Sequence, residues 1–101
     1  MDTQLKKGLL DILVLTTLKR GDSYGYKLVQ DISAVMVINE STLYPVLRRL
    51  EQQQLVSTYS EEHNSRLRKY YKLTKGGFVR LQEFLGEWHQ MQAIYNYIVN
   101  D

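Results

Sequence analysis

Hydrophobic positions recur at helical spacing over most of the chain and switch to strand spacing only once. Residues 3–20 are apolar nearly all round, which predicts a helix that is buried on two sides. Residues 24–33 keep an i, i+4, i+8 spacing, and the stretch Asn39–Val56 keeps the i, i+3, i+4, i+7 spacing of an amphipathic helix. The pattern therefore predicts three helices in the first half of the chain.

Residues that favour helix ends fit these three segments. Ser23 is the expected N-cap of the second helix, and Asn39 or Ser41 is the expected N-cap of the third. Pro45 must lie near the first turn of the third helix, because a deeper proline would break its backbone hydrogen bonds. Gly25, early in the second helix, predicts close packing against a neighbouring helix.

Strand spacing begins at residue 55. Residues 55–61 alternate in part, and residues 67–73 place Tyr71 and Leu73 on a face that we assign to the core. The polar segment 62–66 lies between them. The two strands should therefore form a hairpin with a basic, exposed tip.

A long helix is expected over roughly residues 75–99, with Thr74 as its N-cap. A helix of about 25 residues is about 37 Å long, and a core built from the residues before it does not reach that far. The far half, Trp88–Val99, should therefore project with an apolar face exposed. Such a face usually marks an interface, and a two-fold dimer is the commonest solution.

Composition removes several classes of function. The chain has 101 residues, is 44% hydrophobic and has no cysteine, so one domain is expected without disulfides or thiolate metal sites. No nucleophile–base pair or phosphate-binding loop is present, and the two histidines lie far apart, so no metal, cofactor or enzymatic activity is expected. No apolar run reaches the length of a membrane span and no signal pattern is present, so we expect a cytoplasmic protein without a membrane partner.

The distribution of charge points to a nucleic acid. The net charge is only +2, but residues 41–75 hold seven Lys or Arg against three Asp or Glu. Residues 1–40 are neutral and residues 76–101 are acidic. Basic charge concentrated in one segment is typical of a DNA-binding surface, and the alternative is a solvated surface whose charge is uneven by chance.

The order of predicted elements is helix, helix, helix, strand, strand, helix. This order predicts a mainly α fold with a small β-hairpin (α+β), namely a winged helix-turn-helix. Helices 23–34 and 40–54 would flank the turn, and the second of them would enter the major groove. We expect one compact unit in which residues 1–75 bind DNA and residues 76–101 form a C-terminal dimerisation helix.

Three motifs make the chain resemble the PadR family of bacterial transcriptional regulators, particularly its short members. The motifs are Leu18-x-x-Gly-Asp-Ser-Tyr-Gly-Tyr26, Ser41-Thr-Leu-Tyr-Pro-Val-Leu-Arg-Arg-Leu-Glu51 and Arg68-Lys-Tyr-Tyr-Lys-Leu-Thr74 with Gly77. The resemblance implies a dimeric repressor that binds a palindromic operator through its third helix and wing. It also implies dimerisation through the first and last helices.

Two places depart from the family pattern. Gln54 stands where the family usually has a glycine, so the third helix either runs on or ends in a strained residue. The wing lacks its usual glycine, and Asn64 is expected to take the left-handed conformation in its place.

The resemblance and the charge pattern together name the expected DNA contacts. Tyr24, Tyr44 and Arg68 match family positions at the phosphate backbone. The outer face of the third helix would turn Ser41, Thr42 and Arg48 toward the groove. The full expected set is Tyr24, Ser41, Thr42, Tyr44, Arg48, Arg66, Arg68 and Lys69.

Structural roles remain the alternatives for single residues. Tyr44 could be a half-buried core aromatic, and Arg49 could form an ion pair with Glu51 or Glu83. The alternative for the whole protein is a winged helix that binds another protein and no DNA.

The expected dimer interface lies on the first and last helices and comprises Leu9, Leu13, Leu85, Trp88, Gln92 and Tyr95. In multidrug-sensing members of the family, a tryptophan at the matching place lines a pore between subunits and stacks flat drugs. Trp88 and Leu85 could hold a planar aromatic effector in the same way. Interface packing is the first interpretation of Trp88, and effector binding is the second.

Overall fold

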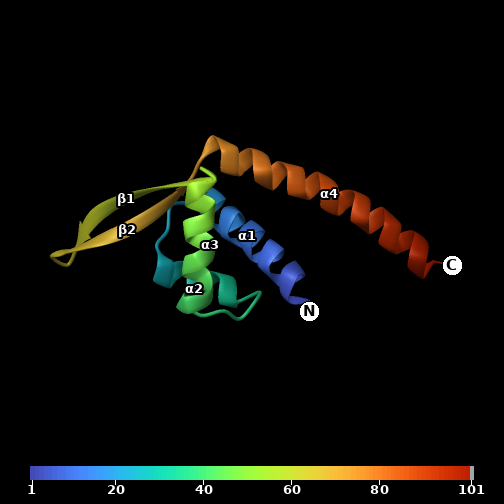
Figure 1. Ribbon diagram of the computed structural model, residues 1–101, viewed down its shortest axis with the longest axis horizontal. Helices are drawn as coiled ribbons and strands as arrows, with labels where there is room; N and C mark the ends of the chain where they lie inside the picture. The colour runs from blue at the N-terminus through green and yellow to red at the C-terminus, as the bar shows by residue number, and fades with distance from the viewer. Residues whose placement is uncertain (101) are drawn as a thin grey trace.

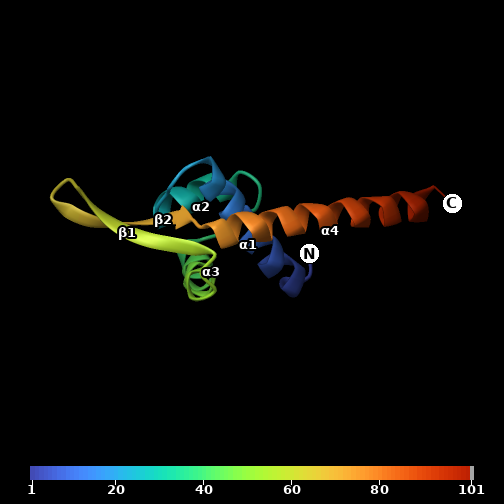
Figure 2. The same ribbon diagram turned by 90° about the horizontal axis from the view of Figure 1, so that it is seen from above.

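A computed structural model of the chain describes residues 1–100, so Asp101, the end of the expected dimerisation segment, lies outside the described residues. The elements are α1 (Thr3–Arg20), α2 (Gly25–Ser33), α3 (Glu40–Gln52), β1 (Val56–His63), β2 (Arg66–Leu73) and α4 (Lys75–Val99). The predicted winged helix-turn-helix fold is confirmed (Figure 1). The hairpin and α4 project from the helical core in opposite directions, and the molecule measures 61 × 27 × 21 Å (Figure 2).

The core lies where α1, α2 and α3 meet the root of the hairpin. The apolar stripe of α3 is fully buried, as its spacing predicted, and each buried leucine adds roughly 1.5–3 kcal/mol to stability. On α1, Leu10, Val14 and Leu15 face this core. Leu9 and Leu13 are only half-buried, and Leu13 packs against the edge of this core.

The N-cap of α3 is Asn39, whose side-chain oxygen accepts from the backbone N–H of Thr42 at 3.0 Å. The predicted N-cap of α2 was wrong. Helix α2 begins after Tyr24, and Ser23 instead pairs with Tyr71 through two backbone hydrogen bonds of 3.1 and 2.7 Å. The backbone of Ser23 thus extends the sheet by one residue, which ties the α1–α2 turn to the wing.

The junction of α3 with the hairpin shows how the departures from the family pattern are accommodated. Helix α3 ends at Gln52, two residues before the predicted end at residue 54, and β1 begins at Val56, one residue after the predicted start of the strand. Gln54 turns the chain with a φ of 61°, in the left-handed conformation that glycine adopts most readily. Of the two alternatives for this position, the strained residue is confirmed.

The hairpin is longer than predicted because its turn contains only Asn64 and Ser65. Both residues have positive φ, 52° and 65°, as the tight hairpin turn that follows strand twist requires. The predicted left-handed conformation of Asn64 is confirmed. At the root, Tyr71 is buried and Leu73 packs against the core, as expected.

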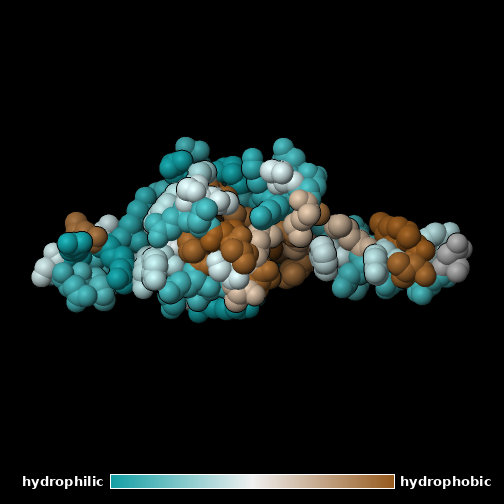
Figure 3. Space-filling view, turned by 90° about the horizontal axis from the view of Figure 1, so that it is seen from below, coloured by the Kyte–Doolittle hydropathy of each residue, from teal (hydrophilic) through white to brown (hydrophobic). Residues whose placement is uncertain are grey.

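Helix α4 has the predicted bounds and the predicted cap, with the Thr74 hydroxyl accepting from the Gly77 N–H at 3.0 Å. Its first turns pack on the core through Gly77 and Leu81. Every described residue from Leu85 onward is exposed. Apolar surface is visible near the free end of the helix (Figure 3), so the predicted projection with an exposed apolar face is confirmed.

Candidate nucleic-acid interface

The outer face of α3 carries exposed polar side chains opposite its buried stripe. The hydroxyls of Ser41 and Thr42 both donate to the Asn39 side-chain oxygen, at 2.6 and 3.1 Å. Their hydrogens are therefore engaged, and their oxygens remain free to accept. Acceptors in a major groove suit the amino groups of adenine or cytosine and not the phosphate oxygens. Arg48, exposed further along the helix, supplies donors.

The wing presents a second group of residues on one face of the hairpin. Tyr59 lies opposite Tyr70 in the register, and their rings stack at 5.4 Å between centroids. Tyr24, which precedes α2, meets the Tyr70 ring edge to face at 5.6 Å. The Arg68 guanidinium carbon lies 3.9 Å from the Tyr24 ring centroid. These contacts join the wing to the start of α2.

A hollow of about 420 Å³ lies where the wing, α2 and α3 meet. Its walls contain a glycine, four tyrosines and two cations: Tyr24, Gly25, Tyr26, Tyr44, Arg68, Lys69 and Tyr71. A Cβ atom on Gly25 would overlap the Tyr44 hydroxyl, so the predicted close packing at Gly25 is confirmed. Half of the expected DNA contacts thus line one surface. Tyr26 lines it too and was not expected, although the tyrosine pair of the first motif could have signalled it.

The other expected contacts are spread along α3 and the wing. Ser41, Thr42 and Arg48 lie on α3, outside the residues that line this hollow. Arg66 lines a hollow of about 430 Å³ at the tip of the wing, together with Arg68. The hairpin therefore carries cations from its root to its tip.

Lys69 and Arg68 both line the hollow, but they belong to opposite faces of the hairpin because neighbouring strand residues alternate. The Lys69 amino group lies 3.6 Å from the carboxylate of Glu51 on α3. The same carboxylate accepts from the Thr58 hydroxyl at 3.1 Å. Glu51 thus fastens both strands to α3, and it partly neutralises one of the expected DNA-contacting charges.

Arg49 forms an ion pair with Asp11 of α1, so neither Glu51 nor Glu83 is its partner. The predicted partners were wrong because Arg49 lies on the flank of α3 that faces α1. Burial raises the pKa of the Asp11 carboxyl, and the nearby charges of Arg49 and Arg80 lower it by less. Arg49 is therefore a structural link between α3 and α1.

Most of the chain matches one known protein family. The sequence model described as the transcriptional regulator PadR-like family matches residues 14–83. The chain belongs to this family. Its members are transcriptional regulators and not enzymes, as the sequence predicted.

Solved structures of several bacterial proteins share the fold of this PadR-like regulator. A transcriptional regulator from Clostridium thermocellum is 30% identical, with 98% of each chain covered and a TM-score of 0.86. A PadR family transcriptional regulator from Eggerthella lenta is 36% identical, with 95% of this chain and 86% of that chain covered and a TM-score of 0.83. A protein from Streptococcus mutans is 41% identical, with 91% and 87% covered and a TM-score of 0.81.

The PadR-like chain also carries an apolar groove of about 380 Å³ on the far part of α4. Its walls are Trp88, Met91, Gln92 and Tyr95. Leu85, one turn earlier, is exposed but does not line this groove. Met91 was missing from the expected residues, although its place on the apolar stripe could have signalled it.

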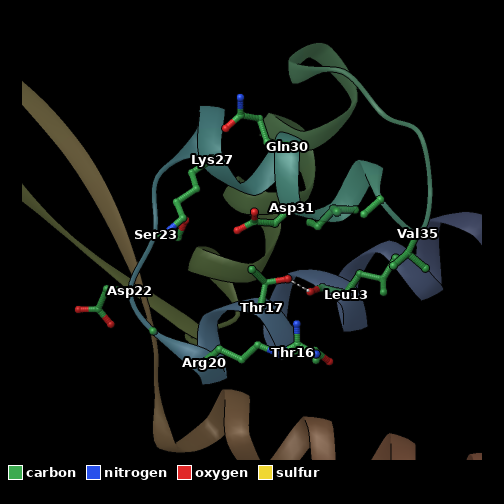
Figure 4. A pocket seen from close by; sticks show the side chains of 13 residues that line it. Leu13, Thr16, Thr17, Arg20, Asp22, Ser23, Lys27, Gln30, Asp31 and Val35 are labelled. Carbon is green, nitrogen blue, oxygen red and sulfur yellow. Dashed lines mark hydrogen bonds between the residues drawn. The ribbon is translucent and has the colours of Figure 1, made fainter.

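A hollow of about 480 Å³ between α1 and α2 contains none of the expected DNA contacts (Figure 4). Arg20 and Lys27 line it together with Asp22 and Asp31, so its charge is mixed and does not favour a polyanion. Ser23 also lines it, and its buried hydroxyl has no hydrogen-bond partner among the described residues.

Residues 1–100 contain neither a candidate metal site nor a candidate membrane span. Within this range, His, Asp and Glu side chains do not gather in groups of three or more that could hold a metal ion. None of the helices described combines the length and the hydrophobicity needed to cross a membrane.

Proposed function

We propose that this regulator is a repressor that binds a palindromic operator as a homodimer. The observation that carries the proposal is the surface where the wing meets α2 and α3. Tyr24, Tyr44 and Arg68 come from three separate parts of the sequence and line one hollow there. A hollow of this kind, with cations and phenols at its rim, suits the phosphate backbone beside a major groove.

The two parts of this surface would serve different purposes. Arg66, Arg68 and Tyr44 contact phosphates and so set the register of the protein on the duplex. Arg48 reads a base edge, because a guanidinium can bind the O6 and N7 atoms of guanine together. Ser41 and Thr42 accept from amino groups of bases, since their own hydrogens are held by Asn39.

Dimerisation would place two such surfaces on one operator. The exposed apolar face of α4, from Leu85 to Tyr95, supports pairing with the half-buried Leu9 and Leu13 of a second copy. Residues 1–75 would then bind DNA while residues 76–101 hold the dimer together. Two-fold symmetry would set the recognition helices about 34–36 Å apart, which is one turn of DNA.

Selection of bound sequences from random DNA tests the proposal directly. We expect the purified protein to enrich a two-fold palindrome. On that site, Arg68→Ala should reduce the slope of log affinity against log salt by about one, because one phosphate contact is lost. Arg48→Ala should also relax the base preference at one position, and Lys6→Ala is the matched control at an exposed cation outside the surface.

One combination of results would contradict the repressor proposal. If no palindrome is enriched and the two arginine variants bind DNA as the unchanged protein does, the repressor proposal is wrong. A stable dimer under those conditions would favour the alternative, a winged helix that binds another protein.

We also propose that a planar aromatic effector binds the α4 groove and releases the DNA. The supporting observation is the apolar groove beside Trp88, whose indole is 42% exposed and stacks on Phe84 at 6.0 Å. Trp88 is the only tryptophan, so its fluorescence should be quenched by planar aromatic compounds. Tyr95→Ala should weaken the quenching. If Trp88 does not respond up to the solubility limit of such compounds, the effector proposal fails.

A further inference from the structure

Arg68 has an unusual position for a residue expected to meet a phosphate, since its guanidinium already rests on an aromatic ring. The guanidinium carbon lies 3.9 Å from the centroid of the Tyr24 ring, and both side chains are half-buried. Contact on the face of the guanidinium leaves the N–H groups at its edge free. Within residues 1–100, Arg68 forms neither an ion pair nor a side-chain hydrogen bond. Its donors are therefore available to an outside acceptor.

The platform beneath Arg68 is itself fixed. The edge-to-face contact between Tyr24 and Tyr70 and the stacking of Tyr70 on Tyr59 continue the series of rings across the hairpin. At its far end, the Tyr59 hydroxyl donates to the Asp22 carboxylate at 2.7 Å. The series therefore starts at the α1–α2 turn, crosses both strands and returns to the residue before α2.

We infer that Tyr24 is a positioning residue, which holds the Arg68 guanidinium in the orientation that meets a backbone phosphate. Tyr59, Tyr70 and Asp22 hold that platform and keep the wing at a fixed angle to α2. This inference rests on the proposed DNA binding. It differs from the role that the family resemblance implies for Tyr24, because the ring acts through Arg68 and its hydroxyl need not touch DNA.

A fixed guanidinium should bind DNA better than a mobile one. An exposed arginine loses the freedom of several rotatable bonds when it binds a phosphate, and this loss weakens binding. An arginine already held on an aromatic face has lost part of that freedom before it binds. The Arg68 side chain should therefore lose less conformational entropy when it binds a phosphate.

Substitution of the ring and of the hydroxyl separates the two possible roles of Tyr24. Tyr24→Phe keeps the platform and removes the hydroxyl, so DNA affinity should stay within about twofold of the unchanged protein. Tyr24→Leu removes the platform and should weaken binding by about three- to thirtyfold. The Tyr24 side chain makes no capping hydrogen bond to α2, so Tyr24→Leu does not remove a cap, and thermal unfolding checks that each variant is folded.

A double-mutant cycle shows whether Tyr24 acts through Arg68. In the Arg68→Ala background, Tyr24→Leu should cause no further loss of affinity. An equal loss in Tyr24→Phe and Tyr24→Leu would overturn the inference, because the hydroxyl would then be the contact. Independent, additive losses from Tyr24→Leu and Arg68→Ala would also overturn it.

The free protein gives a readout that needs no DNA. A proton on the Arg68 side-chain nitrogen should show a ring-current shift in the NMR spectrum, retained in Tyr24→Phe and lost in Tyr24→Leu. An unshifted signal in the unchanged protein would overturn the platform while leaving the proposed function intact. If the platform signal is present and the protein binds no DNA, the proposed function fails and the role in binding fails with it.

Discussion

The wing and α4 both project from the same core, but they are held in different ways. The wing is tied back by polar and aromatic contacts within its own chain, through Glu51 at one strand face and Asp22 at the other. The described part of α4 beyond Leu85 is exposed on all sides and has an apolar face. A braced polar projection is stable in water without a partner. An unbraced apolar projection usually marks a surface that a partner covers.

A charged substitution on the exposed apolar face of α4 should have the largest effect, on both dimerisation and DNA affinity. Met91→Glu places a charge in the middle of the apolar groove, so the proposed dimer should dissociate because a buried unpaired charge is costly. DNA affinity should then fall by about a hundredfold or more, since each half-site is bound alone. Sedimentation velocity and DNA titration measure the two effects.

The control for this variant is Gln90→Glu, which adds the same charge on the opposite side of α4. It should leave both the dimer and DNA binding intact. A dimeric Met91→Glu protein with normal affinity would mean that α4 is not the interface.

Substitution of Gly77, at the point where the hairpin and α4 leave the core, should have the second-largest effect. Gly77 lies at the start of α4, where an added Cβ would overlap the backbone oxygen of Leu55, just before β1, and the Leu73 side chain at the end of β2. Gly77→Ala should therefore lower the free energy of unfolding by about 2–3 kcal/mol. Gly86→Ala, in open space on the projecting part of α4, should raise it by about 0.5–1 kcal/mol. Chemical denaturation measures both, and equal effects would contradict the packing described.

The helices, the N-cap at Thr74 and the left-handed conformation of Asn64 could be predicted from the sequence, because each depends mainly on neighbouring residues. The prediction failed where a distant residue decides the role. Ser23 has the side chain of an N-cap, but its backbone pairs with Tyr71 on the wing. Arg49 likewise had nearer carboxylates in sequence, but it pairs with Asp11.

The candidate site could likewise be predicted only where neighbouring residues decide its structure. Its residue types could be named from the motifs and the charge pattern. The stacking of Arg68 on Tyr24 could not be predicted, because the two residues are distant in sequence and their contact depends on the angle of the hairpin.

Loss of the ion pair between Arg49 of α3 and Asp11 of α1 should lower the stability of the fold by an intermediate amount. The size of this loss should depend on which of the two residues is replaced. Arg49→Ala leaves Asp11 partly buried without its ion pair, at a cost of about 1–3 kcal/mol. Asp11→Ala should cost less, because the Arg49 side chain is 40% exposed and can reach water. Thermal or chemical unfolding gives the two values, and a larger cost for Asp11→Ala would contradict this account.

The pH dependence of Arg49→Ala follows from the raised pKa of Asp11. A group whose pKa is higher in the folded state favours folding when protonated, and this contribution is lost as pH rises. The protonated carboxyl also needs no cation beside it. The cost of Arg49→Ala should therefore shrink as pH falls through the pKa of Asp11.

The smallest expected effect concerns the contact that braces the wing at Asp22. The hydrogen bond from Tyr59 to Asp22 is the main cause that raises the pKa of Tyr59 from 10.0 to about 12. Only the neutral phenol can donate this bond, so the brace is intact below pH 10 and is lost as pH rises through about 12. Burial also raises the pKa of Tyr71, so an ultraviolet titration of tyrosinate should show more than one late-ionising tyrosine, and one of them should be absent in Tyr59→Phe. If Tyr59→Phe instead removes a tyrosine that titrates at the ordinary pKa, the wing is not braced at this point, and the contrast between the wing and α4 is weaker than described.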